Sequence, residues 1–262
     1  MKSNRDERTG MNEELLAKPS YFRAVVAVAL FALIAFAGYA ALFIAPDEST
    51  MHLIQRIFYF HVPSWIACFT AFTIVFVSNI GWLVTRRRKW DALGVSAAEV
   101  GVIACTIGLI TGPLWAKPVW GIWWTWDARL TTTFILWLLY ISYLLLRDLV
   151  EDPERRASLS ALFGIFAFLD VPLVYLSNRL WRTQHPQPVI LGGANSGLDP
   201  TMGKVLLLCA VAVLAIMVLV LVDRYRLELL TREADDLRIQ IESQSFAAED
   251  GARRDPAGNL DS

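Results

Sequence analysis

Six long apolar segments constrain the fold of this 262-residue chain more than any other feature of its sequence. Each is close to the roughly 20 residues that a helix needs to cross the hydrocarbon core of a bilayer. Hydrophobic residues make up 55% of the chain, which exceeds the roughly 45–50% apolar content of soluble domains. We therefore predict an all-α integral membrane protein with six transmembrane helices, at about 22–44, 62–84, 96–114, 131–147, 158–177 and 203–223.

The distribution of basic residues predicts the orientation of these helices. Seventeen lysines and arginines lie in the leader, the 86–89 loop, the loop after the fourth segment and the tail, whereas six lie in the other connections. The positive-inside rule then places both termini in the cytoplasm and the segments 45–61, 115–130 and 178–202 at the outer face. The first apolar segment is too long for the h-region of a signal peptide, so we interpret it as a retained helix.

The domain organisation follows from these segments. We predict a cytoplasmic leader at 1–21, a six-helix transmembrane domain at 22–223, a cytoplasmic amphipathic helix at 224–247 and a disordered tail at 248–262. Heptad spacing predicts the amphipathic helix. Its apolar side would pack in a coiled coil, against a short helix or against a loop at the membrane face. Its apolar positions are Leu227, Leu230, Ala234, Leu237 and Ile241.

The three cysteines exclude one kind of chemistry. Cys68, Cys105 and Cys209 all lie inside apolar segments, and the sequence contains no C-x-x-C motif. The chain therefore has neither a sequence-local redox pair nor a c-type haem attachment site. We expect the cysteines to be small buried side chains.

The outer segments contain an unusual concentration of aromatic residues. The stretch WGIWWTWDARLT at 120–131 has four tryptophans within seven positions. On a helix, Trp120, Trp123 and Trp124 would share one face with Asp127, and Trp126 would lie off it. We expect a short amphipathic helix along the membrane surface that presents a flat aromatic face.

Simpler interpretations of this stretch stay open. The tryptophans are also compatible with an aromatic belt at the membrane interface. Asp127 is suited to cap the N-terminus of the fourth transmembrane helix, and Arg129 is suited to reach lipid headgroups. The outer segments also contain all three histidines, which are His52, His61 and His185.

Four stretches together resemble a known family. In their order and spacing they are similar to the haem-handling Trp-Asp family, and within it to the cytochrome c maturation protein C (haem exporter protein C) family. The resemblance covers about residues 20 to 225. The stretches are FYFHVPSW (58–65), WAKPVWGIWWTWDARLT (115–131), DVPLVYLSNRLWRTQH (170–185) and GLDPTM (197–202).

The resemblance implies a haem site at the outer, periplasmic face. His61 and His185 match the axial ligands of the family, and imidazole is a suitable ligand for haem iron. The porphyrin would rest on an indole platform, and arginines would bind its propionates. Gly121 and Asp127 would contact haem or its chaperone, whereas His52 has no assigned role. The platform residues are Trp115, Trp120, Trp123, Trp124 and Trp126, and the propionate candidates are Arg56 and Arg129.

The resemblance also implies a function in cytochrome c biogenesis at the bacterial inner membrane. The protein would hold non-covalent, b-type haem and present it to a periplasmic haem chaperone, cytochrome c maturation protein E. Further partners would be cytochrome c maturation proteins A and B, which form the associated ABC transporter, and the small cytochrome c maturation protein D, with no nucleic acid. The sequence has no P-loop, so ATP hydrolysis would belong to the transporter, and the resemblance implies that the thioether chemistry takes place on other proteins. We therefore expect a carrier and not an enzyme.

Three other functions stay in view. A cytochrome c synthase or a b-type electron-transfer cytochrome needs histidines inside the membrane, and none of the six predicted spans contains one in its interior. A small-molecule permease needs polar residues along the middle of the membrane. Apart from Asp170, the spans contain few polar residues. Asp170 also has a simpler interpretation, in which it bonds backbone groups that Pro172 leaves without a helical partner.

Overall fold

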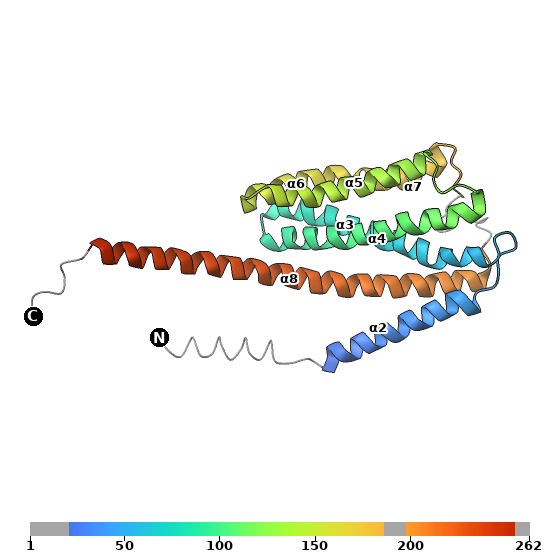
Figure 1. Ribbon diagram of the computed structural model, residues 1–262, viewed down its shortest axis with the longest axis horizontal. Helices are drawn as coiled ribbons and strands as arrows, with labels where there is room; N and C mark the ends of the chain where they lie inside the picture. The colour runs from blue at the N-terminus through green and yellow to red at the C-terminus, as the bar shows by residue number, and fades with distance from the viewer. Residues whose placement is uncertain (1–20, 186–197, 255–262) are drawn as a thin grey trace, which may run out of the picture.

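The computed structural model describes residues 21–185 and 198–254, and in these ranges the chain is a helical bundle (Figure 1). Six stretches of the described residues are long and apolar enough to cross a membrane, with α6 and α7 forming one of them. The predicted six-span, all-α architecture is confirmed. The elements are α2 (Tyr21–Tyr39), η1 (Ala40–Ile44), η2 (Leu53–Ile57), α3 (Phe58–Thr85), α4 (Arg88–Trp120), α5 (Ala128–Leu149), α6 (Pro153–Phe168), α7 (Asp170–Leu180) and α8 (Pro200–Arg254).

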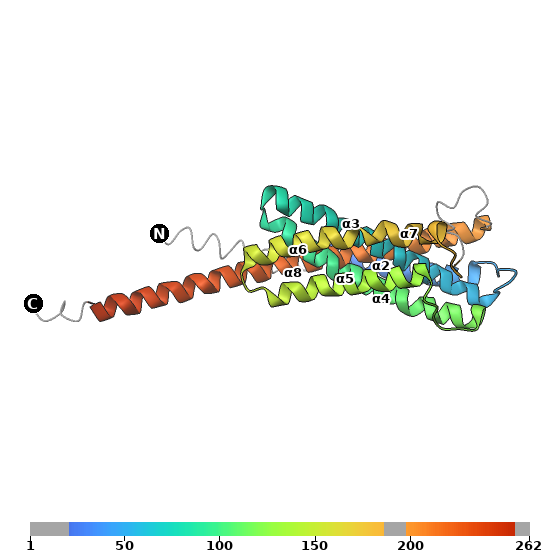
Figure 2. The same ribbon diagram turned by 90° about the horizontal axis from the view of Figure 1, so that it is seen from above.

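The helices α3 and α4 form the centre of the bundle. Helices α5, α6 and α7 lie on one side of this pair, α8 packs against α3 and α4 from the other side, and α2 lies along α8 (Figures 1 and 2). We call the end beyond which α8 extends the tail end; it contains the turns at 86–87 and 150–152. The opposite end, where α4 and α7 finish, is the cavity end.

Small side chains bring the central helices close together. Ala67 and Ala71 of α3 and Ala97 and Ala98 of α4 are buried in the main core, as expected where membrane helices associate through close backbone approach. Larger rings fill the space between α3 and α5, where Phe72 and Tyr140 stack with ring centroids 3.5 Å apart. The three cysteines are buried and unpaired, so the prediction for them is confirmed.

Several helices are longer than the apolar segments indicate. Helix α4 runs through Pro113 and Pro118; neighbouring helices make such prolines tolerable in membrane helices. Helix α8 continues without a break to Arg254, so the structure differs from the expected boundaries at 224 and 248. Residues 1–20 and 255–262, which include most of the predicted leader and the end of the predicted tail, lie outside the described residues.

Asp170 marks an interruption in the fifth span. Helix α6 ends at Phe168, and α7 begins at Asp170 after a single intervening residue. The Asp170 side chain is buried, and its Oδ2 atom has no hydrogen-bond partner among the described residues.

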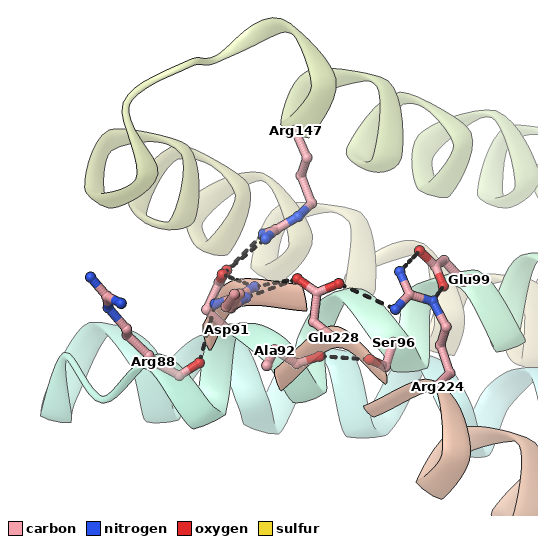
Figure 3. A network of polar contacts seen from close by, with 9 residues as sticks. Arg88, Asp91, Ala92, Ser96, Glu99, Arg147, Arg224 and Glu228 are labelled. Carbon is pink, nitrogen blue, oxygen red and sulfur yellow. Dashed lines mark hydrogen bonds and ion pairs between the residues drawn. The ribbon is translucent and has the colours of Figure 1, made fainter. Parts of the chain in front are cut away.

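An ion network at the tail end joins α4, α5 and α8 (Figure 3). Asp91 of α4 receives two hydrogen bonds from Arg147 of α5, at 2.6 and 2.9 Å, and a third from Arg232 of α8 at 2.7 Å. Arg232 also donates to Glu228, at 2.8 Å. Arg224 bonds both Glu228 and Glu99, so that three arginines face three carboxylates.

The burial of this network makes it structurally important. The side chains of Asp91 and Arg147 are each 6% exposed, and a charge removed from water is tolerated only with a well-placed partner. The Arg147–Asp91 pair is bidentate, which is the strong form of an arginine–carboxylate ion pair. The network therefore fixes the part of α8 at residues 224–232 against the bundle.

We predict that Asp91→Ala destabilises the protein strongly, because it leaves the buried Arg147 guanidinium without its main partner. The expected loss in the free energy of unfolding is about 3–5 kcal/mol, measured by denaturant titration in detergent micelles. Arg238→Ala is the matched control, since its ion pair with Glu242 is exposed and such pairs contribute about 0.5 kcal/mol or less. Equal losses for the two variants would contradict this assignment.

Candidate functional site

A cavity of about 490 Å³ opens at the cavity end of the bundle, within the size range of pockets that take small molecules and cofactors. Its walls come from residues 48–55, α3, α4, the tryptophans at 123–124, the start of α5, α7, residues 184–185 and the start of α8 with Leu198. Both His61 and His185 line it, although they are 124 positions apart in the sequence. The aromatic residues of the wall are Phe58, Trp65, Phe69, Trp115, Trp120, Trp123 and Trp124.

His61 lies in the first turn of α3 and is held by two hydrogen bonds. The structure thus has His61 at the end of the second span, where the predicted outer segment 45–61 meets it. Its Nε2 atom is 3.1 Å from the indole Nε1 of Trp65, and its Nδ1 atom is 2.8 Å from the hydroxyl of Thr111 on α4. The Thr111 hydroxyl donates to the carbonyl of Ile107, at 2.8 Å.

These contacts determine the tautomer of His61. An indole nitrogen can only donate, so Nε2 must be the accepting nitrogen of a neutral imidazole. The proton is then on Nδ1 and is donated to Thr111. A hydrogen bond at one ring nitrogen fixes which nitrogen is available for a ligand. Here that nitrogen is Nε2, on the side of Trp65.

The residues 120–127, which we call the tryptophan segment, do not form the helix that their periodicity predicts. Helix α4 ends at Trp120, and Gly121 follows in the left-handed region at φ 77°, where glycine is favoured. Residues 122–127 are irregular, and α5 begins at Ala128. The sequence periodicity is misleading because a helix C-cap and a helix N-cap lie at the two ends of the segment.

Asp127 explains how this segment is ordered. Its carboxylate accepts a hydrogen bond from the backbone N–H of Leu130, at 3.0 Å, which confirms its interpretation as the N-cap of a helix. It also accepts one from the hydroxyl of Thr125, at 3.1 Å, and one from the backbone N–H of Gln184, at 3.3 Å. Asp127 therefore connects the tryptophan segment to the residue that precedes His185.

His185 contacts Trp120, the first residue of the tryptophan segment. Its ring and that of Trp120 meet edge to face, with centroids 6.3 Å apart. His61 makes a similar contact with Trp115, at 5.7 Å. Each histidine is thus positioned against a tryptophan of α4.

Four of the five predicted platform residues line the cavity. The exception is Trp126, which is 72% exposed and packs edge-on against Trp124 and Phe134. Gly121 and Asp127 also lie outside the wall. Trp65 is part of the wall but is not among the predicted site residues; its spacing of four from His61 on a helix could have indicated the contact.

The two predicted propionate ligands differ in position. Arg129 lines the cavity, and its Nη1 atom has no partner among the described residues. Arg56 lies outside the wall, where it forms an ion pair with Asp47, at 2.9 Å. The structure therefore does not bring Arg56 into the cavity; Asp47 on the preceding loop pairs with its Nη2 atom, whereas its Nε and Nη1 atoms have no partner among the described residues.

A carboxylate lies at the rim of the cavity. Glu48 accepts backbone hydrogen bonds from Met51 and Thr50, and these bonds lower the pKa of Glu48 from its ordinary value. It therefore stays ionised well below neutral pH. His52, the third histidine, follows in this loop at φ 50° and is not part of the cavity wall.

Together these features define a class of protein. It is a multi-span membrane protein with a mainly apolar cavity at one end, lined by seven Phe and Trp side chains together with two histidines and one arginine from separate elements. Such a wall suits a large, flat, apolar ligand that carries a few polar groups.

Comparison with known proteins identifies the family. The chain belongs to the Heme exporter protein C family, whose sequence pattern matches residues 10–240. Heme exporter protein C of Bradyrhizobium diazoefficiens is 31% identical over 93% of this chain and 96% of the relative. The protein of the same name from Paracoccus denitrificans is 34% identical over 48% of this chain and 54% of its own length. That of Escherichia coli (strain K12) is 28% identical over 60% and 63%.

Two neighbouring glycines of α4 give a test of the packing behind His61. A Cβ atom at Gly108 would lie 2.6 Å from the indole of Trp65, whereas one at Gly112 would lie 3.5 Å from Cε1 of His61, an ordinary contact. We predict that Gly108→Ala lowers the free energy of unfolding by about 1–3 kcal/mol through overpacking. Gly112→Ala should be neutral or slightly stabilising, because alanine favours helices.

Thermal unfolding in detergent, followed by tryptophan fluorescence, measures both effects. A Gly108→Ala variant as stable as Gly112→Ala would show that Trp65 is not held where the structure places it.

Proposed function

We propose that the cavity binds haem non-covalently, with His61 and His185 as axial ligands of the iron. The family supports a role in haem handling for cytochrome c biogenesis. The observation that carries the proposal is that both histidines line one cavity whose wall also contains five tryptophans. Imidazole is a common ligand of haem iron.

The residues of the cavity fit the rest of the ligand. Trp115, Trp120, Trp123 and Trp124 provide the apolar surface on which a porphyrin plate can lie. The Nη1 atom of Arg129 has no hydrogen-bond partner among the described residues. A guanidinium binds carboxylates in a planar, bidentate manner. We assign it to a haem propionate. Glu48 at the rim disfavours a second carboxylate there.

The orientation and partners of the protein follow from the same proposal. The basic residues of the tail end, among them 86–89, support a cytoplasmic position for that end. The cavity would then face the periplasm across a bacterial inner membrane. There the protein would present haem to the haem chaperone, cytochrome c maturation protein E. Further partners would be cytochrome c maturation proteins A and B of the ABC transporter and the small cytochrome c maturation protein D.

We propose a carrier and not an enzyme. The residues of the cavity can bind and orient haem, but the covalent attachment of haem to a cytochrome would take place on other proteins. The tail of α8 from residue 224 would lie in the cytoplasm, where it is accessible to the transporter.

The histidine assignment predicts the absorption spectrum of the purified protein with haem. The wild type should show a low-spin spectrum, and His61→Ala and His185→Ala should each convert it to high-spin or abolish it, because one axial ligand is lost. His52→Asn is the matched control, since Asn tolerates the positive φ of this position, and its spectrum should match the wild type. A wild type that binds no haem would refute the proposal and favour a permease.

The propionate assignment predicts a difference between two ligands. Arg129→Gln should lower the affinity for haem by about 10- to 100-fold, as expected for the loss of a hydrogen bond to a charged group. It should leave the affinity for haem dimethyl ester, which lacks both carboxylates, unchanged.

The control for this experiment is Arg56→Gln, because Arg56 is paired with Asp47 outside the cavity. It should affect neither ligand. Equal losses for haem and its ester in Arg129→Gln would show that Arg129 acts only on the shape of the cavity.

A further inference from the structure

The hydrogen bond between Trp65 and His61 has a consequence for haem binding. A neutral imidazole has a single ring nitrogen with a free lone pair. In His61 this is Nε2, and the indole N–H of Trp65 is already bonded to it, at 3.1 Å. An iron ion at His61 needs the same lone pair, so the indole and the metal compete for one atom.

Thr111 holds His61 in the tautomer in which the indole and the metal compete for Nε2. Because its own proton is donated to the carbonyl of Ile107, the Thr111 hydroxyl is an acceptor for the Nδ1–H of His61. Moving the proton to Nε2 would break the bond from Trp65, and the Thr111 hydroxyl would have to leave the Ile107 carbonyl in order to donate to Nδ1. Nε2 therefore remains the nitrogen that can bind a metal.

Trp65 is itself well placed to form and release the bond. It lies one turn after His61 on α3, lines the cavity, and packs against Gly108 and the ring of Phe69. The Trp65 ring therefore stays beside His61 when the hydrogen bond opens, and the same bond can form again after the ligand has left.

We propose that Trp65 is a displaceable internal partner of His61, which holds Nε2 when haem is absent and must release it for iron to bind. The inference rests on the proposed function of the cavity. In the exchange one coordination bond forms and one hydrogen bond breaks, and no proton moves: the indole keeps its N–H, and Nδ1 keeps its bond to Thr111. Trp65 is thus a positioning residue that weakens haem binding.

A hydrogen bond that competes with the metal suits a protein that must transfer its ligand to another protein. The net contribution of one hydrogen bond corresponds to about a 2- to 10-fold change in a binding constant. The affinity of the site for haem would be lowered by this factor, and the returning indole would assist the release of the imidazole from iron.

The test compares Trp65→Phe with Trp137→Phe in the full-length protein. Both variants remove an indole N–H from a membrane helix, but that of Trp137 donates to Thr106, at 2.9 Å, away from the cavity wall. Haem affinity is measured by titration, and the release rate by transfer to an excess of apomyoglobin.

Trp65→Phe should bind haem about 2- to 10-fold more tightly and release it correspondingly more slowly, whereas Trp137→Phe should match the wild type. Unchanged or weaker binding in Trp65→Phe, while wild type binds haem and His61→Ala does not, would overturn this inference and leave the proposed function intact. No binding by the wild type would overturn both.

A second measurement uses the wild type and does not depend on the folding of a variant. Ultraviolet resonance Raman spectra report whether indole N–H groups are hydrogen-bonded. Haem addition should convert one bonded indole into a weakly bonded one, and this change should persist in Trp137→Phe. A spectrum in which the bonded indoles are unaffected by haem would contradict the exchange.

Discussion

The structure depends on one constraint, that a polar or charged group removed from water must find its partner within the protein. At the tail end the constraint is met: Asp91, Arg147 and Arg232 bond one another, and Glu228, Arg224 and Glu99 extend the network. At the cavity end it is not, because the guanidinium of Arg129 has an unpartnered nitrogen among the described residues. The charges at one end of the bundle therefore serve its stability, and the cation at the other end is suited to an anionic ligand.

Asp127 links the order of the cavity to this constraint. A single carboxylate begins α5, holds Thr125 of the tryptophan segment and bonds the backbone next to His185. Its role as a cap and its place in the functional motif are therefore not alternatives. By capping α5 it fixes the position of the segment that carries Trp123 and Trp124, and by bonding Gln184 it brings the second histidine to the same cavity.

The sequence could predict the six spans, because their length and apolarity are set by the bilayer and hardly depend on packing. It could also predict that His61, His185, four of the five tryptophans and Arg129 belong together, through the resemblance of their motifs. It could not predict that the tryptophan segment is irregular, since a 3.6-residue periodicity is equally visible in a stretch that a cap interrupts at each end.

Pairing across helices is the other feature beyond the reach of the sequence. In the sequence Arg147, Arg224 and Arg232 indicate only orientation, but each has a carboxylate partner on another helix or one turn away. Arg56 resembles a ligand residue because nothing in the sequence shows that Asp47 pairs with it. For Trp65 the sequence offers only its spacing of four from His61, which does not show that its indole bonds the imidazole.

The central claim is that one cavity, formed by the ends of α3, α4 and α5 with the segment at His185, is the haem site. An experimental density map of the haem-loaded protein in a lipid nanodisc tests it most directly. The account predicts iron coordinated by Nε2 of His61 and by His185, with the porphyrin against the cavity-lining tryptophans and a propionate at Arg129. Haem bound elsewhere, or in this cavity without His61 as a ligand, would contradict it.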